Sequence, residues 1–246
     1  PMEYAKALCA HAKEQGLEVP IYTTGANFFV KEPEKELERL CRHIDIAAEC
    51  KIPLLRHDVA WGYYEGYTGI KSYKKVIEAV APLVRQAAEY ARERGVKTCS
   101  ENHGYLLQDS VRMLELFAAV DHPNYGFLCD MGNFTVVDED CATAVSALSD
   151  YIVHVHAKDM LVRSGMNFDP GRGYNLSRGG NYWRGTIFGH GNVPTFQILS
   201  AIRKSGYDGY VSLEFEGMEP VLEGVEIGTQ NLQHMIEVIG EGQRYV

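Results

Sequence analysis

The chain has 246 residues, of which 46% are hydrophobic and 23% charged, a composition that predicts one domain over residues 1–246 with a large core. No apolar run approaches the roughly 20 residues of a membrane-spanning helix and no signal-peptide pattern opens the sequence, so we expect a cytoplasmic protein. The formal net charge of −9 disfavours nucleic acid as a partner.

Strand-like and helix-like segments alternate along the chain. Apolar residues at helical spacing predict helices over residues 1–15, 33–49, 71–94, 110–119, 139–148, 194–204 and 221–239. Short runs rich in β-branched and aromatic residues predict strands over residues 17–24, 53–57, 96–101, 125–130, 151–156 and 210–214. This alternation indicates an α/β fold with a parallel sheet, either doubly wound or a (β/α)8 TIM barrel. The glycine-rich first turn typical of a doubly wound sheet is absent, which favours the barrel.

Residues 160–191 interrupt the alternation of predicted strands and helices. The segment has no clear helical pattern, is dense in glycine, and contains arginines and aromatic residues. We expect it to form an ordered lid over the catalytic mouth or a contact with a neighbouring subunit, with Arg184 binding substrate. A surface excursion packed on the side of the barrel is the alternative. The six cysteines show no C-x-x-C spacing and are expected to be reduced, structural thiols.

Polar residues gather where the predicted strands end. A carboxylate at the end of a buried strand costs several kcal/mol in desolvation unless it is paired or holds a metal. We therefore expect one metal site built from the residues at four strand ends, Glu101, Asp130, His156 and Glu214. Three carboxylates and one imidazole suit Mn²⁺ or Mg²⁺, with Co²⁺ or Zn²⁺ also compatible.

With these residues placed, the chain resembles the sugar phosphate isomerase/epimerase superfamily, the xylose-isomerase-like TIM barrels. The resemblance rests on five segments: Ser-Glu-Asn-His-Gly at 100–104, Cys-Asp-Met-Gly-Asn at 129–133, His-Val-His-Ala-Lys-Asp at 154–159, Gly-His-Gly-Asn-Val at 189–193, and residues 206–214. Family barrels carry a β-α-β unit ahead of the helix with which this sequence starts. We therefore expect this chain to lack the first β-α-β unit of the barrel.

The resemblance implies a divalent-metal-dependent isomerase or epimerase, most simply with Mn²⁺. Its substrate would be a sugar or a related polyhydroxy carbonyl compound, and its protons would move through a metal-stabilised enediolate. Glu101 and Glu214 would flank the substrate and move the protons, with His103 as a further acid/base group. Epimerisation needs two such groups on opposite faces and isomerisation needs one, and the residues fit either reaction. A homo-oligomer is the expected assembly.

The expected substrate contacts are His57, Asn133, Lys158 and Arg184. Ketose epimerases often carry a histidine where this sequence has Asn133, which argues against an ordinary ketohexose epimerase. Three residues also have a purely structural interpretation. His103 could be a structural loop histidine, Lys158 could form an ion pair with Asp159, and Glu216 could form a salt bridge at the rim of the barrel. His154 is expected in the core or behind the metal ligands.

Three other functions fit parts of the pattern. A lyase acting on a 3-keto-glycoside would begin with the same proton abstraction and then expel a β-substituent. Such a barrel can require a small partner subunit. An endonuclease IV-like phosphodiesterase would need a trinuclear zinc cluster and a basic groove, for which the sequence offers too few ligands. A sugar-binding barrel without catalysis is the remaining alternative.

Overall fold

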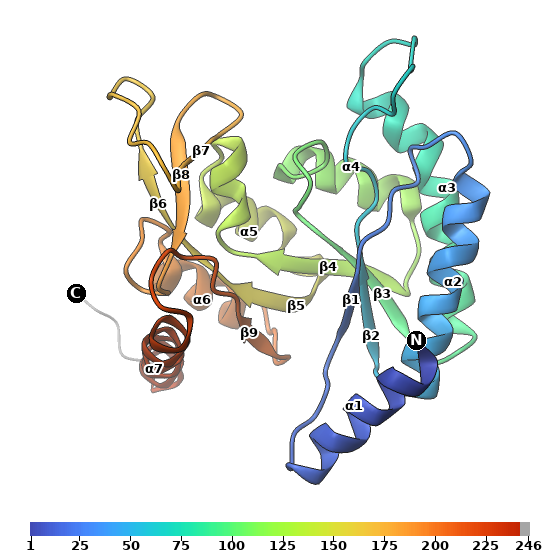
Figure 1. The fold of residues 1–246 in the computed structure, drawn as a ribbon, viewed down its shortest axis with the longest axis horizontal. Helices are drawn as coiled ribbons and strands as arrows, with labels where there is room; N and C mark the ends of the chain where they lie inside the picture. The colour runs from blue at the N-terminus through green and yellow to red at the C-terminus, as the bar shows by residue number, and fades with distance from the viewer. Residues whose placement is uncertain (242–246) are drawn as a thin grey trace. The chain divides into compact units, whose positions relative to one another are not determined.

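The computed structural model describes residues 1–241 and contains two compact units. Unit 1 consists of Pro1–Leu107 and Val111–Phe127, and unit 2 of Gln108–Ser110 and the chain from Leu128 onward. Helices and strands alternate through most of the chain (Figure 1), as the hydrophobic pattern predicts.

Unit 1 is a parallel sheet with helices packed against it. Its strand order is β1-β2-β3-β4, and residue 55 of β2 pairs with residue 22 of β1 and residue 98 of β3. The elements are α1 (Met2–Glu14), β1 (Tyr22–Thr24), α2 (Pro33–Glu49), β2 (Leu54–His57), α3 (Tyr73–Arg92), β3 (Lys97–Glu101), α4 (Ser110–Val120) and the first half of β4 (Tyr125–Asp130). Strand β1 is shorter than the strand predicted over 17–24, because only the last three residues of that segment pair with β2.

The core of unit 1 follows from the spacing of apolar residues. Leu40, Ile44 and Ala47 recur at intervals of four and three in α2, so they share one face, and all three are fully buried. Burying a leucine or isoleucine side chain stabilises the fold by about 1.5–3 kcal/mol. Helix α3 packs beside α2 (Figure 1), and the chain leaves it through Gly95, whose φ of +70° favours glycine.

Unit 2 contains the end of β4 and the two remaining strands of the main sheet, in the order β4-β5-β9. Strands β5 and β9 are parallel, with His156 opposite Ser212 and Ala157 opposite Leu213. The other elements are the 3₁₀ helices η1 (Asn133–Val137) and η2 (Ser149–Tyr151), α5 (Cys141–Leu148), α6 (Thr195–Lys204) and α7 (Val221–Gly240), around β5 (Ile152–Ala157) and β9 (Val211–Leu213). Because β5 and β9 run in the same direction, the residues that follow them lie at one edge of the sheet.

The segment 160–191 forms mainly a second, antiparallel sheet in the order β6-β8-β7. Its strands are β6 (Asp159–Arg163), β7 (Asn175–Leu176) and β8 (Tyr182–Thr186). The absence of a helical pattern was correctly predicted, but the strands were not, because they are short and carry charged, polar or glycine residues in place of an apolar run. That this sheet acts as a lid stays a prediction.

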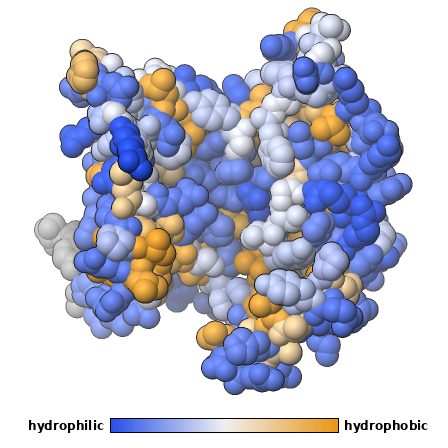
Figure 2. Space-filling model, viewed as in Figure 1, coloured by the Kyte–Doolittle hydropathy of each residue, from blue (hydrophilic) through white to orange (hydrophobic). Residues whose placement is uncertain are grey.

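The face of the molecule drawn in Figure 2 is largely hydrophilic, with a few apolar patches. One patch lies over the first turns of α7, where Val221, Leu222 and Val225 are exposed. Among residues 1–241, no helix combines the length and apolar character needed to cross a membrane. All six cysteines are free thiols, as predicted.

Candidate active site

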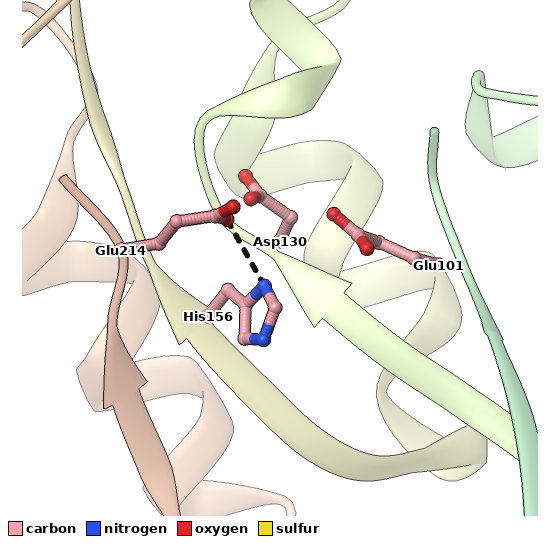
Figure 3. A group of neighbouring side chains, drawn as sticks. All are labelled: Glu101, Asp130, His156 and Glu214. Carbon is pink, nitrogen blue, oxygen red and sulfur yellow. Dashed lines mark hydrogen bonds and ion pairs between the residues drawn. The ribbon is translucent and has the colours of Figure 1, made fainter. Parts of the chain in front are cut away.

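Three predicted metal ligands converge in unit 2. Asp130 ends β4, His156 lies near the end of β5, and Glu214 follows β9 directly. One ligand atom from each lies within 4.8 Å of the others, and the three side chains point toward one another (Figure 3). His156 Nδ1 is 3.0 Å from Glu214 Oε2, and the backbone N–H of Glu214 donates to the Ala157 carbonyl at 3.1 Å. The parallel pairing of β5 and β9 therefore fixes His156 beside Glu214.

Asp130 is held by the turn that follows its strand. Its Oδ1 accepts hydrogen bonds from the backbone N–H groups of Gly132 and Asn133, both at 2.8 Å, and the side chain is fully buried. Such bonds favour the ionised carboxylate. The turn therefore presents a charged oxygen to the interior of the cluster.

Lys158 is the cation of this cluster and is almost fully buried. Its Nζ lies 3.2 Å from Asp130 Oδ2, 3.1 Å from Glu214 Oε2 and 3.1 Å from Glu216 Oε2. The plainer reading, an ion pair with Asp159, does not describe this arrangement. Asp159 instead accepts hydrogen bonds from the backbone N–H groups of Met160, Gly189, Gly191 and Val193. It thereby anchors the 189–193 turn.

The electrostatics of the cluster keep Glu214 ionised. Burial alone would raise the pKa of this carboxyl group, but the hydrogen bond from His156 and the charge of Lys158 outweigh burial and hold the pKa far below its usual range. Two carboxylates and an imidazole at this separation are donors that fit a hard or borderline divalent cation. Asp130, His156 and Glu214 could therefore hold such an ion.

A second network lies in unit 1 and contains Glu101, the fourth predicted ligand. The Arg56 guanidinium lies 2.7 Å from Glu101 Oε2 and 2.9 Å from Asp58 Oδ1. Asp58 Oδ1 is also 2.9 Å from His103 Nδ1. Arg56, Asp58 and Glu101 are buried, whereas the His103 side chain is 49% exposed. Arg56 thus joins a predicted catalytic carboxylate to an aspartate-histidine pair.

The two histidines of unit 1 have opposite surroundings. The hydrogen bond to Asp58 raises the pKa of His103 and, together with its exposure, leaves it able to exchange protons. His57 is completely buried, its Nδ1 lies 2.8 Å from the Asp58 carbonyl oxygen, and burial lowers its pKa to about 4. That His57 contacts substrate stays a prediction.

The other predicted polar residues of unit 2 occupy different places. Asn133 Oδ1 lies 3.4 Å from Lys158 Nζ. Arg184 on β8 forms an ion pair with Glu219, with Nη2 lying 3.4 Å from Oε1. Its role in substrate binding stays a prediction. His154 is a core residue, as expected, with Nε2 2.8 Å from Ser212 Oγ. Glu216 makes the expected salt bridge, with Lys158 as its partner.

Arg56 and Asp58 were not predicted from the sequence. They flank His57 at the end of a short apolar run, and this is the same signal that marked Glu101 and Asp130. Reading the whole triplet Arg56-His57-Asp58 as a polar strand end would have found both residues.

Comparison with known proteins places the chain in a family. Residues 2–239 match the family described as xylose isomerase-like TIM barrel. The chain belongs to this family. The match extends over both units.

A curated relative of this xylose isomerase-like barrel is an inosose dehydratase of Lacticaseibacillus casei. The two are 28% identical over 142 residues, which are 56% of this chain and 47% of the relative. The match therefore spans about half the length of that relative.

Solved structures share the fold at lower identity. A 3-keto-D-glucoside 4-epimerase from E. coli superimposes with a TM-score of 0.70 and 17% identity, covering 95% of this chain and 85% of that one. A xylose isomerase-like TIM-barrel protein from Mycobacterium smegmatis, solved in complex with magnesium, gives a TM-score of 0.69 and 18% identity, covering 94% and 77%. At these identities the likeness shows the fold alone.

Proposed function

We propose that this protein is a divalent-metal-dependent isomerase or epimerase of a sugar or a related polyhydroxy carbonyl compound. The observation that carries the proposal is the convergence of Asp130, His156 and Glu214 at neighbouring strand ends in a member of this family. We further propose that both units belong to one catalytic domain, since the family match runs through both. The cytoplasmic location and a homo-oligomeric assembly stay predictions.

The proposed metal ligands are Glu101, Asp130, His156 and Glu214. Glu101 ends β3 as Asp130 ends β4, and these strands are neighbours in the sheet order, which supports it as the fourth ligand. Bound there, a divalent ion such as Mn²⁺ would polarise the substrate carbonyl and stabilise negative charge on its oxygen. The magnesium complex of the M. smegmatis protein supports a divalent ion without choosing the metal.

The proton transfers are assigned to the carboxylates. Glu214 is the proposed base for the proton on the carbon beside the carbonyl, and it is in the ionised form that a base requires because His156 and Lys158 hold its pKa low. Glu101, ion-paired with Arg56, is the second group that epimerisation would require. Lys158 is the proposed donor to the substrate oxygen on which negative charge develops.

His103 is assigned a further proton transfer, to or from a substrate hydroxyl. Asp58 holds its Nδ1, so Nε2 remains the nitrogen that can exchange protons. Arg56 in turn holds Asp58 in place. Arg56 and Asp58 are thus positioning residues for Glu101 and His103.

A lyase acting on a 3-keto-glycoside is the second candidate. The inosose dehydratase relative and the 3-keto-D-glucoside epimerase neighbour support it by their names, and Asn133 in place of the epimerase histidine supports it in the sequence. Such an enzyme would use the same first proton abstraction and then expel the β-substituent. We propose that, if the protein is such a lyase, it acts together with a small partner subunit.

The test is hydrogen exchange in D₂O. Protein stripped with chelator and reloaded with Mn²⁺ is incubated with ketohexoses and with 3-keto-glucosides, and deuterium incorporation is followed by NMR. We expect metal-dependent exchange that falls about 10²- to 10⁴-fold in Glu214→Gln. The exposed Glu223→Gln on α7 serves as the matched control and should match wild type. Release of the aglycone would favour the lyase, and exchange that is indifferent to chelator would contradict both candidates.

A further inference from the structure

Unit 1 contains an open groove of about 930 Å³ that includes none of the proposed metal ligands. It lies where the chain leaves β1 and β2, next to the start of α2. Its lining includes Gly25, Trp61, Tyr64, Lys31 and Arg42. The volume is in the range of small-molecule sites, typically about 300–1,000 Å³.

One wall of the groove is aromatic. Trp61 is 55% exposed, so a large part of its indole is accessible to a ligand. Its indole lies against Gly25, because a Cβ at that position would come within 2.9 Å of Trp61 Cζ2. Tyr64 beside it packs on Phe29 with ring centroids 5.6 Å apart. These rings form a fixed face on which a sugar ring can stack.

The charged residues that line the groove are four cations, Lys31, Lys35, Arg39 and Arg42, and three carboxylates, Glu32, Glu36 and Glu65. Lys35 pairs with Glu32 at 2.5 Å, and Arg39 binds Glu36 through two nitrogens at 2.8 and 2.9 Å. Lys31 and Arg42 line the groove with no ion pair among residues 1–241. With four cations against three carboxylates, the groove lining carries one net positive charge in a protein of net charge −9, which favours an anionic group.

The groove is connected to the acid/base pair of unit 1 through Trp61. This residue follows β2 by four positions and donates a hydrogen bond to Asp58, the partner of His103. Trp61 follows β2 and His103 follows β3, its neighbour in the sheet. A ring stacked on Trp61 would therefore lie at the edge of the unit 1 sheet where His103 also lies.

We propose that this groove binds the second ring of a glycoside substrate, a sugar ring bearing a negatively charged carboxylate or phosphate. Trp61 and Tyr64 would contact the ring, and Lys31 and Arg42 would bind its anionic group. The proposal rests on the proposed function in taking the ligand as a carbohydrate. It adds that the substrate is a charged glycoside rather than a simple monosaccharide.

The test compares matched disaccharides by calorimetry on Mn²⁺-loaded protein. The ligands are cellobiose, the same disaccharide with a terminal glucuronate, and its 6-phosphate counterpart. We expect at least one acidic disaccharide to bind about 10-fold more tightly than cellobiose, the equivalent of about 1.4 kcal/mol. The two acidic ligands distinguish a carboxylate from a phosphate.

Variants then assign the contacts. Combining Lys31→Ala with Arg42→Ala should reduce acidic-ligand affinity to that of cellobiose, whereas Lys13→Ala on exposed α1 should change nothing. Trp61→Ala, and Gly25→Ala by displacing the indole, should weaken all disaccharides about 5- to 10-fold, the range expected for loss of an aromatic contact. Thermal melts would check that each variant is folded.

Equal affinity for acidic and neutral disaccharides would overturn the proposal, as would binding unchanged in the double variant or no binding of any disaccharide. Hydrogen exchange on a neutral 3-keto-glucoside, which lacks the anionic group, is measured in parallel, and the double variant should keep the wild-type rate. Absence of exchange in the wild type and in all variants would contradict the proposed function. The affinities of the disaccharides would still test the groove proposal, because they are measured without turnover.

Discussion

The guanidinium of Arg56 lies 2.7 Å from the Glu101 carboxylate in the interior of unit 1. Removing this cation would leave the carboxylates of Glu101 and Asp58 buried without it. We expect Arg56→Met to lower the free energy of unfolding by about 3–5 kcal/mol, the usual cost of breaking a buried pair. Urea unfolding measures this. Arg92→Met removes an exposed pair with Glu89 and should cost much less, because solvent screens that pair. Equal losses would contradict the account.

Asp58 should control the ionisation of His103. Its hydrogen bond raises the pKa of His103, so the pair stabilises the fold fully below the ordinary histidine pKa, and this stability is lost as pH rises through the raised value. We expect Asp58→Asn to lower the pKa of His103, as measured by NMR titration of the imidazole. An unchanged titration curve would show that the contact does not govern His103.

The buried His57 predicts an acid sensitivity of the opposite sign. Its pKa is lowered to about 4, so between pH 6.5 and 4 the unfolded chain binds a proton that the native state does not. Stability therefore falls as pH drops through this window, by about 2 kcal/mol at pH 5 relative to pH 7 from this group alone. In His57→Gln, the difference in unfolding free energy between pH 7 and pH 5 should shrink by that amount. A difference equal to that of wild type would argue against a neutral His57.

Lys158 should oppose metal binding while supporting catalysis. Its ammonium lies at 3.2 and 3.1 Å from Asp130 and Glu214, whose oxygens a metal would share. We expect Lys158→Met to bind Mn²⁺ at least as tightly as wild type, because the carboxylates lose a competing cation. Hydrogen exchange should fall about 10²- to 10³-fold, since a donor to the developing charge is gone. Calorimetry and the exchange assay measure the two effects, and weaker metal binding in this variant would contradict the competition.

The sequence pattern predicted the six strands of the main sheet from short β-rich runs, and most helices from apolar residues at a period of 3.6. It also predicted that Asp130, His156 and Glu214 come together, since they end strands of one parallel sheet. Strands β6, β7 and β8 escaped prediction because they are short and carry charged, polar or glycine residues, so no apolar run marks them. The bonds of Arg56 to Asp58 and Glu101 escaped because a buried ion pair leaves no periodic trace.

The central claim is that the residues of the unit 2 cluster hold a divalent metal. Pulsed EPR of Mn²⁺ added to metal-stripped protein tests it directly, because a bound imidazole nitrogen couples to the electron spin. We predict one Mn²⁺ per chain with a histidine nitrogen coupling that disappears in His156→Gln and persists in the exposed control His234→Gln. A protein that binds no Mn²⁺, or a coupling that survives in His156→Gln, would contradict the claim.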